Sequence, residues 1–235
     1  MYGEYEKALA GLKYGLESDI GTGAAKAIIQ FGAPVLRKSG DDVGAYAPES
    51  VTATFSANFV ASNSIVAKVA GVTLAAVVFA TDHATTFAAL VAALAAVSGV
   101  TIVASDATAR TITVKVAGQA TGLSFTITGG ASQATVAMAL ASGYSFGGVA
   151  LRVQKGKVRS TDDSVGARYD LTEPVPLLKR GGIWVHAADA VGSFKAAYLT
   201  TDGAWTDESA GNIAISGLAF ESSTTAAGLA QLAVK

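Results

Sequence analysis

The stretch that decides the fold is Val51-Thr-Ala-Thr-Phe55-Ser-Ala-Asn-Phe59, in which apolar residues alternate with small polar ones. This period of two is typical of a β-strand with one buried face. The same composition of Ala, Val, Thr, Ser and Gly continues to Phe146. Residues 51–146 hold only five of the chain's 17 basic and 18 acidic side chains, namely Lys68, Asp82, Asp106, Arg110 and Lys115. A region so poor in reactive groups favours a packing surface over an active site.

Short β-branched segments bounded by Gly, Asp or Ser predict more strands in this region. We expect them at residues 64–70, 72–79, 100–103, 111–116, 124–128 and 135–140. One helix is predicted among them, because apolar residues recur at helical spacing: Phe87, Leu90, Val91, Leu94 and Val97. Thr81 or Asp82 is suited to cap its start, and Gly99 to end it. Residues 51–146 are therefore expected to form an inserted α+β domain, with one sheet and one helix.

The two ends of the chain, residues 1–50 and 147–235, carry most of the charges. Glycines without a sustained period predict an extended or looped N-terminal arm of about residues 1–23. Strands are expected at residues 28–36, 149–153, 171–178, 182–187, 194–200, 213–221 and 229–234. Such short, closely spaced strands favour a β-barrel or β-sandwich. The predicted fold is mainly β, with this discontinuous core formed by the N- and C-terminal parts.

The composition limits the class of partner. Hydrophobic residues make up 51% of the chain and charged residues 15%, yet no apolar run approaches the roughly 20 residues of a membrane-spanning helix. The N-terminus lacks the apolar core of a secretory signal. A net charge of −1 gives no general attraction to nucleic acid or anionic lipid. We therefore expect neither a nucleic-acid nor a membrane partner.

Candidate chemical groups are scattered. The chain has no cysteine and two histidines, His83 and His186, whose surroundings supply no further metal ligands. His83 lies where a helix is expected to start, a place where an imidazole can bond free backbone groups. The pairs Asp41-Asp42 and Asp162-Asp163 are typical of solvated turns.

The basic residues Lys155, Lys157 and Arg159 alternate, and with Lys179-Arg180 they could contact phosphates, although a solvated or partner-facing strand edge fits better. No glycine group matches a phosphate-binding loop. We predict no catalytic, cofactor-binding or metal site, and hence no enzyme.

The C-terminal third resembles the structural cement proteins, which decorate the capsids of tailed bacteriophages. The resemblance rests on short motifs: Val175-Pro-Leu-Leu-Lys-Arg-Gly-Gly-Ile-Trp-Val-His186, Ala196-Ala-Tyr-Leu-Thr-Thr-Asp-Gly203, Gly217-Leu-Ala-Phe220 and the closing Leu-Ala-Gln-Leu-Ala-Val-Lys235. Gly11-Leu-Lys-Tyr-Gly15 and Phe31-Gly-Ala-Pro-Val35 are similar to the opening of that family. Residues 79–87 and the segments after them resemble a small domain of phage tail and virion proteins.

This resemblance implies a virion protein, made in the bacterial host cytoplasm, that lies on the capsid surface. It implies the major capsid protein as partner and a role in reinforcing contacts between capsid subunits, without a cofactor. Self-association as a dimer or trimer is expected, because a surface poor in charge has little charge to desolvate.

Aromatic residues are the candidates for the partner interface, because such residues dominate interface energetics. They are Tyr14, Phe31, Trp184, Phe194, Tyr198 and Trp205, of which the last four could instead anchor the core. The alternative is a phage tail or receptor-binding module that recognises host glycan, with Trp184 and Trp205 as a sugar-stacking platform.

Overall fold

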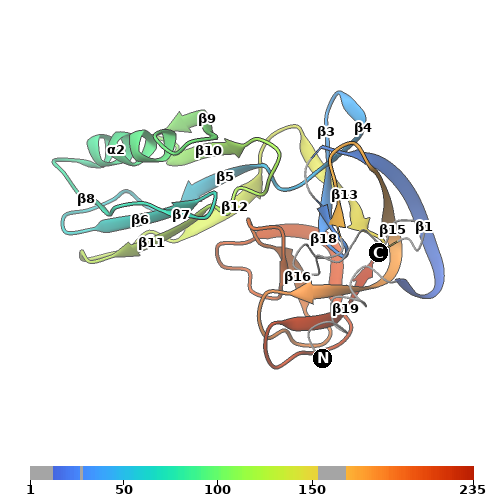
Figure 1. The fold of residues 1–235 in the computed structure, drawn as a ribbon. Coiled ribbons are helices and arrows are strands. Elements are labelled where there is room, and N and C mark those ends of the chain that lie inside the picture. Colours follow the sequence, from blue (N-terminus) through green and yellow to red (C-terminus); the bar gives the residue numbers. More distant parts are fainter. Residues whose placement is uncertain (1–12, 27–28, 153–167) are drawn as a thin grey trace, which may run out of the picture.

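The structure is a computed structural model that describes residues 13–26, 29–152 and 168–235. It is mainly β, which confirms the predicted fold class. Figure 1 shows a barrel made largely of C-terminal strands, and a lobe of strands and one helix that projects to one side of it. The lobe is formed by the elements between Ser50 and Leu140.

Five strands close the barrel. Backbone pairing runs from β15 to β17, β16, β18, β19 and back to β15. The bounds are β15 (Pro174–Ala187), β16 (Ala196–Leu199), β17 (Trp205–Thr206), β18 (Ile213–Phe220) and β19 (Gly228–Val234). Ile183 and Val185 point into the barrel, whereas the alternate residues Trp184 and His186 are more exposed, as the period of a strand requires. The apolar half of this alternation fills the barrel core.

β15 replaces two strands that the sequence analysis expected at 171–178 and 182–187. The chain continues through Gly181 and Gly182 as one strand of 14 residues. Gly181 has φ +117°, a conformation that side chains disfavour. The glycine pair therefore bends the strand without ending it.

The N-terminal strands join β15 through β1, which pairs with it from Pro174 to Ile183. They are β1 (Lys13–Ala25), β3 (Pro34–Lys38) and β4 (Asp41–Tyr46), together with the later β13 (Tyr144–Ala150), and their pairings close a second ring through β15. A separate pair joins β2 (Ile29–Gln30) to β14 (Arg168–Tyr169). From Lys13 onwards the expected extended or looped arm is a strand. Its register with β15 shifts on either side of Asp19, which explains why the sequence shows no sustained alternation.

The lobe contains two sheets where the sequence predicted one. The first, β12–β5–β10–β9, is continuous with the barrel sheet, and the second consists of β11, β6, β7 and β8. The bounds are β5 (Ser50–Phe55), β6 (Ser64–Val69), β7 (Val72–Thr73), β8 (Val77–Val78), β9 (Val100–Asp106), β10 (Thr111–Val116), β11 (Ser124–Thr128) and β12 (Val136–Leu140). The sheets are separate because β6 pairs with β11, not with β5. A core centred on Phe55 lies between them.

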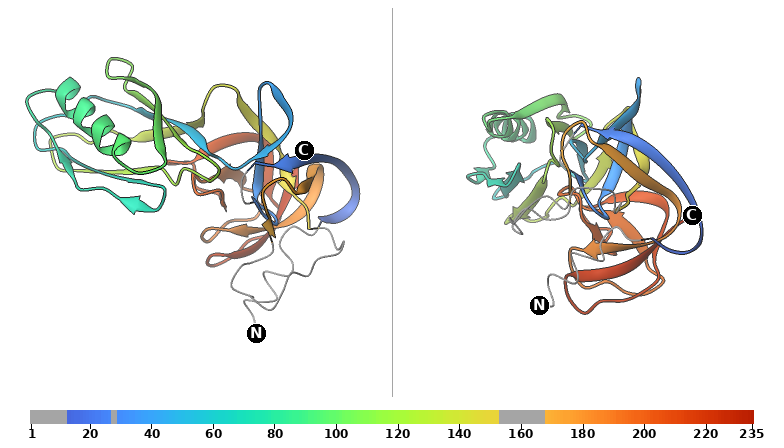
Figure 2. Two further views of the ribbon diagram at one scale, coloured as in Figure 1. Left: turned by 45° about the horizontal axis from the view of Figure 1, so that its top comes forward. Right: turned by 45° about the vertical axis from the view of Figure 1, so that its right-hand side comes forward.

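The helix α2 (His83–Ala95) is the one expected from the apolar spacing. Its N-cap is Asp82, whose side chain accepts a hydrogen bond from the Thr85 amide at 2.7 Å. Phe87, Leu90 and Leu94 are buried and pack in the lobe core. Figure 2 shows the helix on one side of the lobe.

The chain passes between the barrel and the lobe twice, before β5 and after β12, and further contacts also attach the lobe to the barrel. The amide of Gly122 donates to the Thr201 carbonyl at 3.0 Å, and the Thr201 hydroxyl donates to the Leu123 carbonyl at 2.8 Å. Met138 on β12 pairs with Ile213 on β18. The lobe core therefore extends into the barrel strands, where it includes Ile213.

Candidate interaction surfaces

Trp205 lies in the barrel core. It is 1% exposed, its Nε1 donates to the Gly32 carbonyl at 2.8 Å, and its ring meets Phe146 edge-on with centroids 6.2 Å apart. At this burial Trp205 is a core residue of the closed barrel and is not part of its exposed surface. The sugar platform that required Trp184 and Trp205 together on the surface is lost for the same reason.

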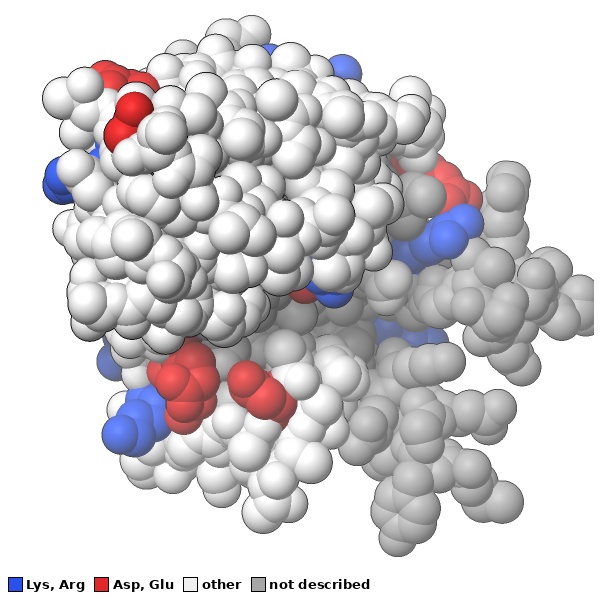
Figure 3. Space-filling model, turned by 90° about the vertical axis from the view of Figure 1, so that its left-hand side faces the viewer, with Lys and Arg blue, Asp and Glu red and all other residues white. Residues whose placement is uncertain are grey.

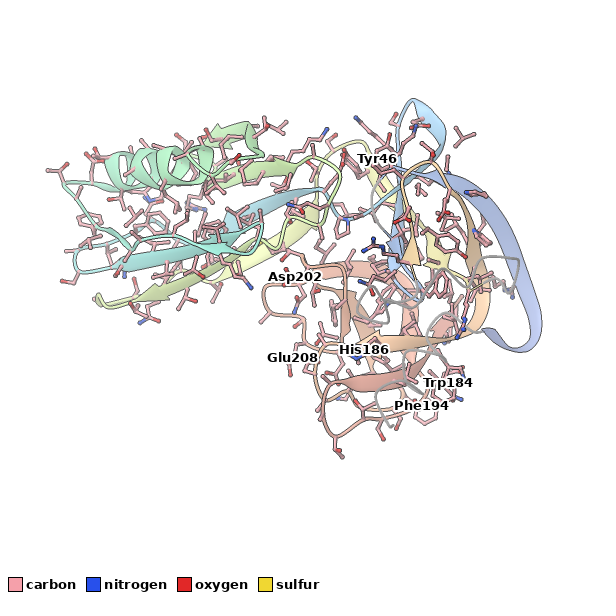
Figure 4. All side chains as sticks on the ribbon, viewed as in Figure 1. Tyr46, Trp184, His186, Phe194, Asp202 and Glu208 are labelled. Atoms are coloured by element: carbon pink, nitrogen blue, oxygen red, sulfur yellow. The ribbon has the colours of Figure 1, made fainter. Side chains whose placement is uncertain are left out.

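Phe194 is the most exposed large apolar side chain among the described residues, at 85%. Its φ of +61° lies in the left-handed region, which costs a non-glycine residue of the order of 1 kcal/mol. The backbone is held there because the Phe194 amide donates to the Phe220 carbonyl at 2.7 Å. The fold thus fixes an aromatic ring in solvent on the barrel (Figure 4).

The other four aromatic candidates come from different segments of the chain. Trp184 is partly exposed on β15, opposite Gln231 of β19. Tyr198 is partly exposed on β16, and Phe31 packs edge-on against Tyr169 at 5.0 Å. Tyr14 lies in β1, and its side chain is outside the described residues.

His83 has a structural role. Its Nδ1 accepts from the Phe59 amide at 3.0 Å, and its Nε2 lies 3.0 Å from the Ala107 carbonyl. With Nδ1 as acceptor, Nε2 carries the proton and donates it to that carbonyl. The imidazole therefore joins the start of α2 to the segments at Phe59 and Ala107 by bonding backbone groups, in agreement with the structural role expected for it.

A buried carboxylate joins the lobe to β13, outside the lobe. Glu49 is 4% exposed and accepts from the Tyr144 hydroxyl at 2.6 Å and from the Gly118 amide at 3.2 Å, with Lys115 Nζ at 3.5 Å. Burial is the largest cause that raises the pKa of Tyr144 above its usual range, and the hydrogen bond to Glu49 is the second. Glu49 precedes β5 and Tyr144 begins β13, so the bond ties together the two crossings of the chain. Sequence reasoning missed Glu49, whose one signal is that it is the last charged residue before the charge-poor stretch.

A second carboxylate–phenol pair stabilises the β3–β4 hairpin. Asp41 accepts from the Tyr46 hydroxyl at 2.6 Å and from the Gly44 amide at 2.8 Å. The Tyr46 bond is the main cause that lowers the pKa of Asp41, and the same bond raises the pKa of Tyr46 to about 12. Asp41 is therefore a bonded group of the hairpin and not only a solvated turn residue.

This pair predicts a loss of stability at alkaline pH. A phenol whose folded pKa is raised stabilises the fold fully below its unfolded pKa of about 10, and the contribution disappears as pH rises towards 12. We expect the stability difference between wild type and Tyr46→Phe, measured by urea unfolding, to shrink from pH 9 to pH 12. Because all other phenols are common to both proteins, a difference that does not change with pH would contradict the role of this bond.

The lobe surface is almost free of charge. Figure 3 looks at the molecule from the lobe side, and the lobe in front is nearly all uncharged atoms. Acidic and basic side chains gather at its borders and on the barrel below. On this face the charge-poor composition of residues 51–146 becomes a broad, nearly uncharged surface.

Within the described residues, no three His, Cys, Asp or Glu side chains gather as metal ligands. A hollow of about 310 Å³ is lined by Arg37, Phe146, Gly147, Gly148 and Lys179, which include no carboxylate, hydroxyl, thiol or imidazole group. None of the helices in the described ranges has the length and apolar character needed to cross a bilayer. The basic run 155–159 and Asp162-Asp163 lie outside those ranges.

Comparison with known proteins gives one family. The sequence profile of the family described as Structural cement protein (E217 gp24/Pam3 gp6) matches residues 101–235, more than half of the chain. The match contains every barrel strand and also the part of the lobe from residue 101 onwards. A search of curated proteins found no match. The barrel motifs and this match agree, and the chain belongs to the phage structural cement protein family.

Proposed function

We propose that this protein binds the outer surface of a bacteriophage capsid and reinforces the contacts between neighbouring major capsid subunits. The observation that carries the proposal is membership of the cement family, whose members are structural proteins of the virion. The exposed ring of Phe194 supplies a contact point, because a partner that covers it gains apolar burial at no cost in conformational freedom of the backbone.

Reinforcement requires a body that does not hinge between its points of contact. Three sets of contacts hold the lobe to the rest of the protein. The first is the hydrogen bond between Glu49 and Tyr144. The others are the hydrogen bonds of Thr201 with Gly122 and Leu123, and the pairing of Met138 with Ile213. In this proposal the barrel attaches to the shell and the lobe extends from it at a fixed angle over the neighbouring subunit.

Binding to purified capsids that lack the protein tests the function directly. The wild-type chain should sediment with such shells and raise the temperature at which they rupture. A chain that neither sediments with shells nor occurs in virions would refute the capsid role, whichever residues mediate binding.

Phe194→Gly separates the contact from the fold. Glycine adopts φ +61° freely, so we expect unfolding stability to stay equal or rise by up to about 1 kcal/mol. Loss of the ring should weaken capsid binding at least tenfold, because a buried aromatic anchor contributes about 2 kcal/mol or more. Sedimentation at graded concentrations gives the affinity, and urea unfolding gives the stability.

Val43→Ser is the matched control for Phe194→Gly. Val43 is an exposed apolar residue on β4, away from Phe194 in the sheet order. It should bind shells like wild type. Unchanged binding by Phe194→Gly would place the capsid contact elsewhere on the protein and would leave the capsid role itself intact.

A further inference from the structure

We propose that strand β11 (Ser124–Thr128) is a dimerisation edge, which pairs antiparallel with β11 of a second copy of this chain. β11 ends its sheet, because β6 is its one neighbour. No backbone hydrogen bond joins residues 124–128 to any described element other than β6. Its outer row of amides and carbonyls is therefore open to another strand.

The other free edges in the lobe carry the protections that natural sheets use against unwanted pairing. β9 has an irregular register between Thr113 and Val114 of its partner strand, and it ends in the charged Asp106. β7 and β8 have two residues each. β11 has five residues in unbroken register with β6 and contains no charge, proline or glycine. Unlike β9, β7 and β8, it carries none of these protections.

The strand is complementary to itself. In an antiparallel pair centred on Thr126, Thr126 faces Thr126 of the second copy, and Ser124 faces Thr128. On the other face Phe125 stands opposite Ile127. Hydroxyls therefore meet hydroxyls on the outer face, and apolar side chains meet on the face of the lobe core, where Ile127 is buried and Phe125 is partly exposed.

Charge does not oppose this arrangement. The nearest charge in the sheet is Lys68, which lies opposite Ser124 on β6. In the paired sheet the two Lys68 residues are about 20 Å apart, from strand spacings of about 4.8 Å and a rise of about 3.4 Å per residue. That separation exceeds the screening length of about 10 Å at 0.1 M salt.

An isologous pair of edges makes a closed dimer, with the two barrels at opposite ends. Figure 1 shows β11 along the lower border of the lobe, with its Ser124 end towards the barrel. The antiparallel partner therefore directs its own barrel away from that end. Given the proposed capsid role, such a dimer attaches to the shell at two separated points; the pairing itself does not depend on that role.

Sedimentation equilibrium of the purified chain tests the dimer without any capsid. The wild type should be dimeric at micromolar concentration. Thr126→Lys places two like charges face to face and should give a monomer, as should Thr126→Glu. Mixed in equal amounts, the two variants should restore the dimer. The exposed position of Thr126 leaves each monomer folded, which circular dichroism checks.

Val103→Lys is the matched control, since Val103 is 57% exposed on the other long edge, β9. It should remain dimeric. A monomeric wild type would overturn the proposal. So would dimers that persist in each Thr126 variant alone, or Lys and Glu variants that fail to pair when mixed. A monomeric wild type whose capsid binding falls with Thr126→Lys would assign β11 to a capsid strand instead.

Discussion

Replacing Trp205 with alanine should lower the free energy of unfolding by about 3–5 kcal/mol, the range for deleting a large buried aromatic side chain. Trp205 fills the barrel core and bonds Gly32, which lies 173 residues away in the sequence. Its removal leaves a cavity and an unpaired carbonyl on the segment between β2 and β3. Urea unfolding followed by circular dichroism measures the change.

Trp205→Phe and Trp184→Ala separate the causes. Phenylalanine keeps most of the apolar volume and loses the bond to Gly32, so it should cost less than alanine at the same position. Trp184 is partly exposed, so Trp184→Ala should cost under about half as much as Trp205→Ala. Equal losses at both tryptophans would contradict the placement of Trp205 inside the barrel.

Replacing Phe55 with alanine should destabilise the lobe by a similar amount, about 3–5 kcal/mol. The ring is fully buried and meets Phe59, Phe87 and Phe125 edge-on, with centroid distances of 5.1, 6.2 and 5.0 Å. Each such aromatic pair adds about 0.5–1.5 kcal/mol beyond burial alone. The alanine variant loses all three contacts at once.

The same variant tests whether the lobe is a folding unit of its own, as the proposed division at residues 51–146 requires. Both tryptophans lie in the barrel, so tryptophan fluorescence reports on the barrel. Among the described elements α2 is the one α-helix, so helical circular dichroism reports on the lobe. In Phe55→Ala we expect the helical signal to melt at a lower temperature than the fluorescence.

Coincident transitions in Phe55→Ala would mean that lobe and barrel unfold together. The shared core favours such coupled unfolding, because the lobe core includes Leu199 and Ile213 of the barrel. Separate transitions would therefore show that the lobe core is stable enough to act as a unit despite this contact. Val78→Ala is the control: Val78 is exposed on the lobe, and its truncation should leave both transitions unchanged.

Local patterns in the sequence predicted local structure well. The spacing of Phe87, Leu90 and Leu94 gave the helix, and Asp82 its cap, because a helix is closed by bonds between near neighbours. The backbone role of His83 followed from its place at the helix start. The strand alternation of Ile183 to Val185 likewise needs only the geometry of one strand.

The pairing of strands could not be derived in this way. The split of the lobe into two sheets depends on β6 choosing β11, which lies some 60 residues further along the chain. The union of two expected strands in β15 depends on partners on both sides of Gly181, namely β1 and β19. Alternation shows which face of a strand is apolar but not which strand lies beside it.

The sequence by itself determined a mainly β protein with one helix, a charge-poor middle and the barrel motifs of a cement protein. Only the tertiary structure decided that Trp205 is core and Phe194 is surface, although both are aromatic residues of the same barrel. Ring closure by β15, β18 and β19 encloses the first and leaves the second in solvent. Whether a side chain is exposed depends on which distant segments pack around it. The residue pattern within one segment therefore could not predict that Trp205 is buried and Phe194 is exposed.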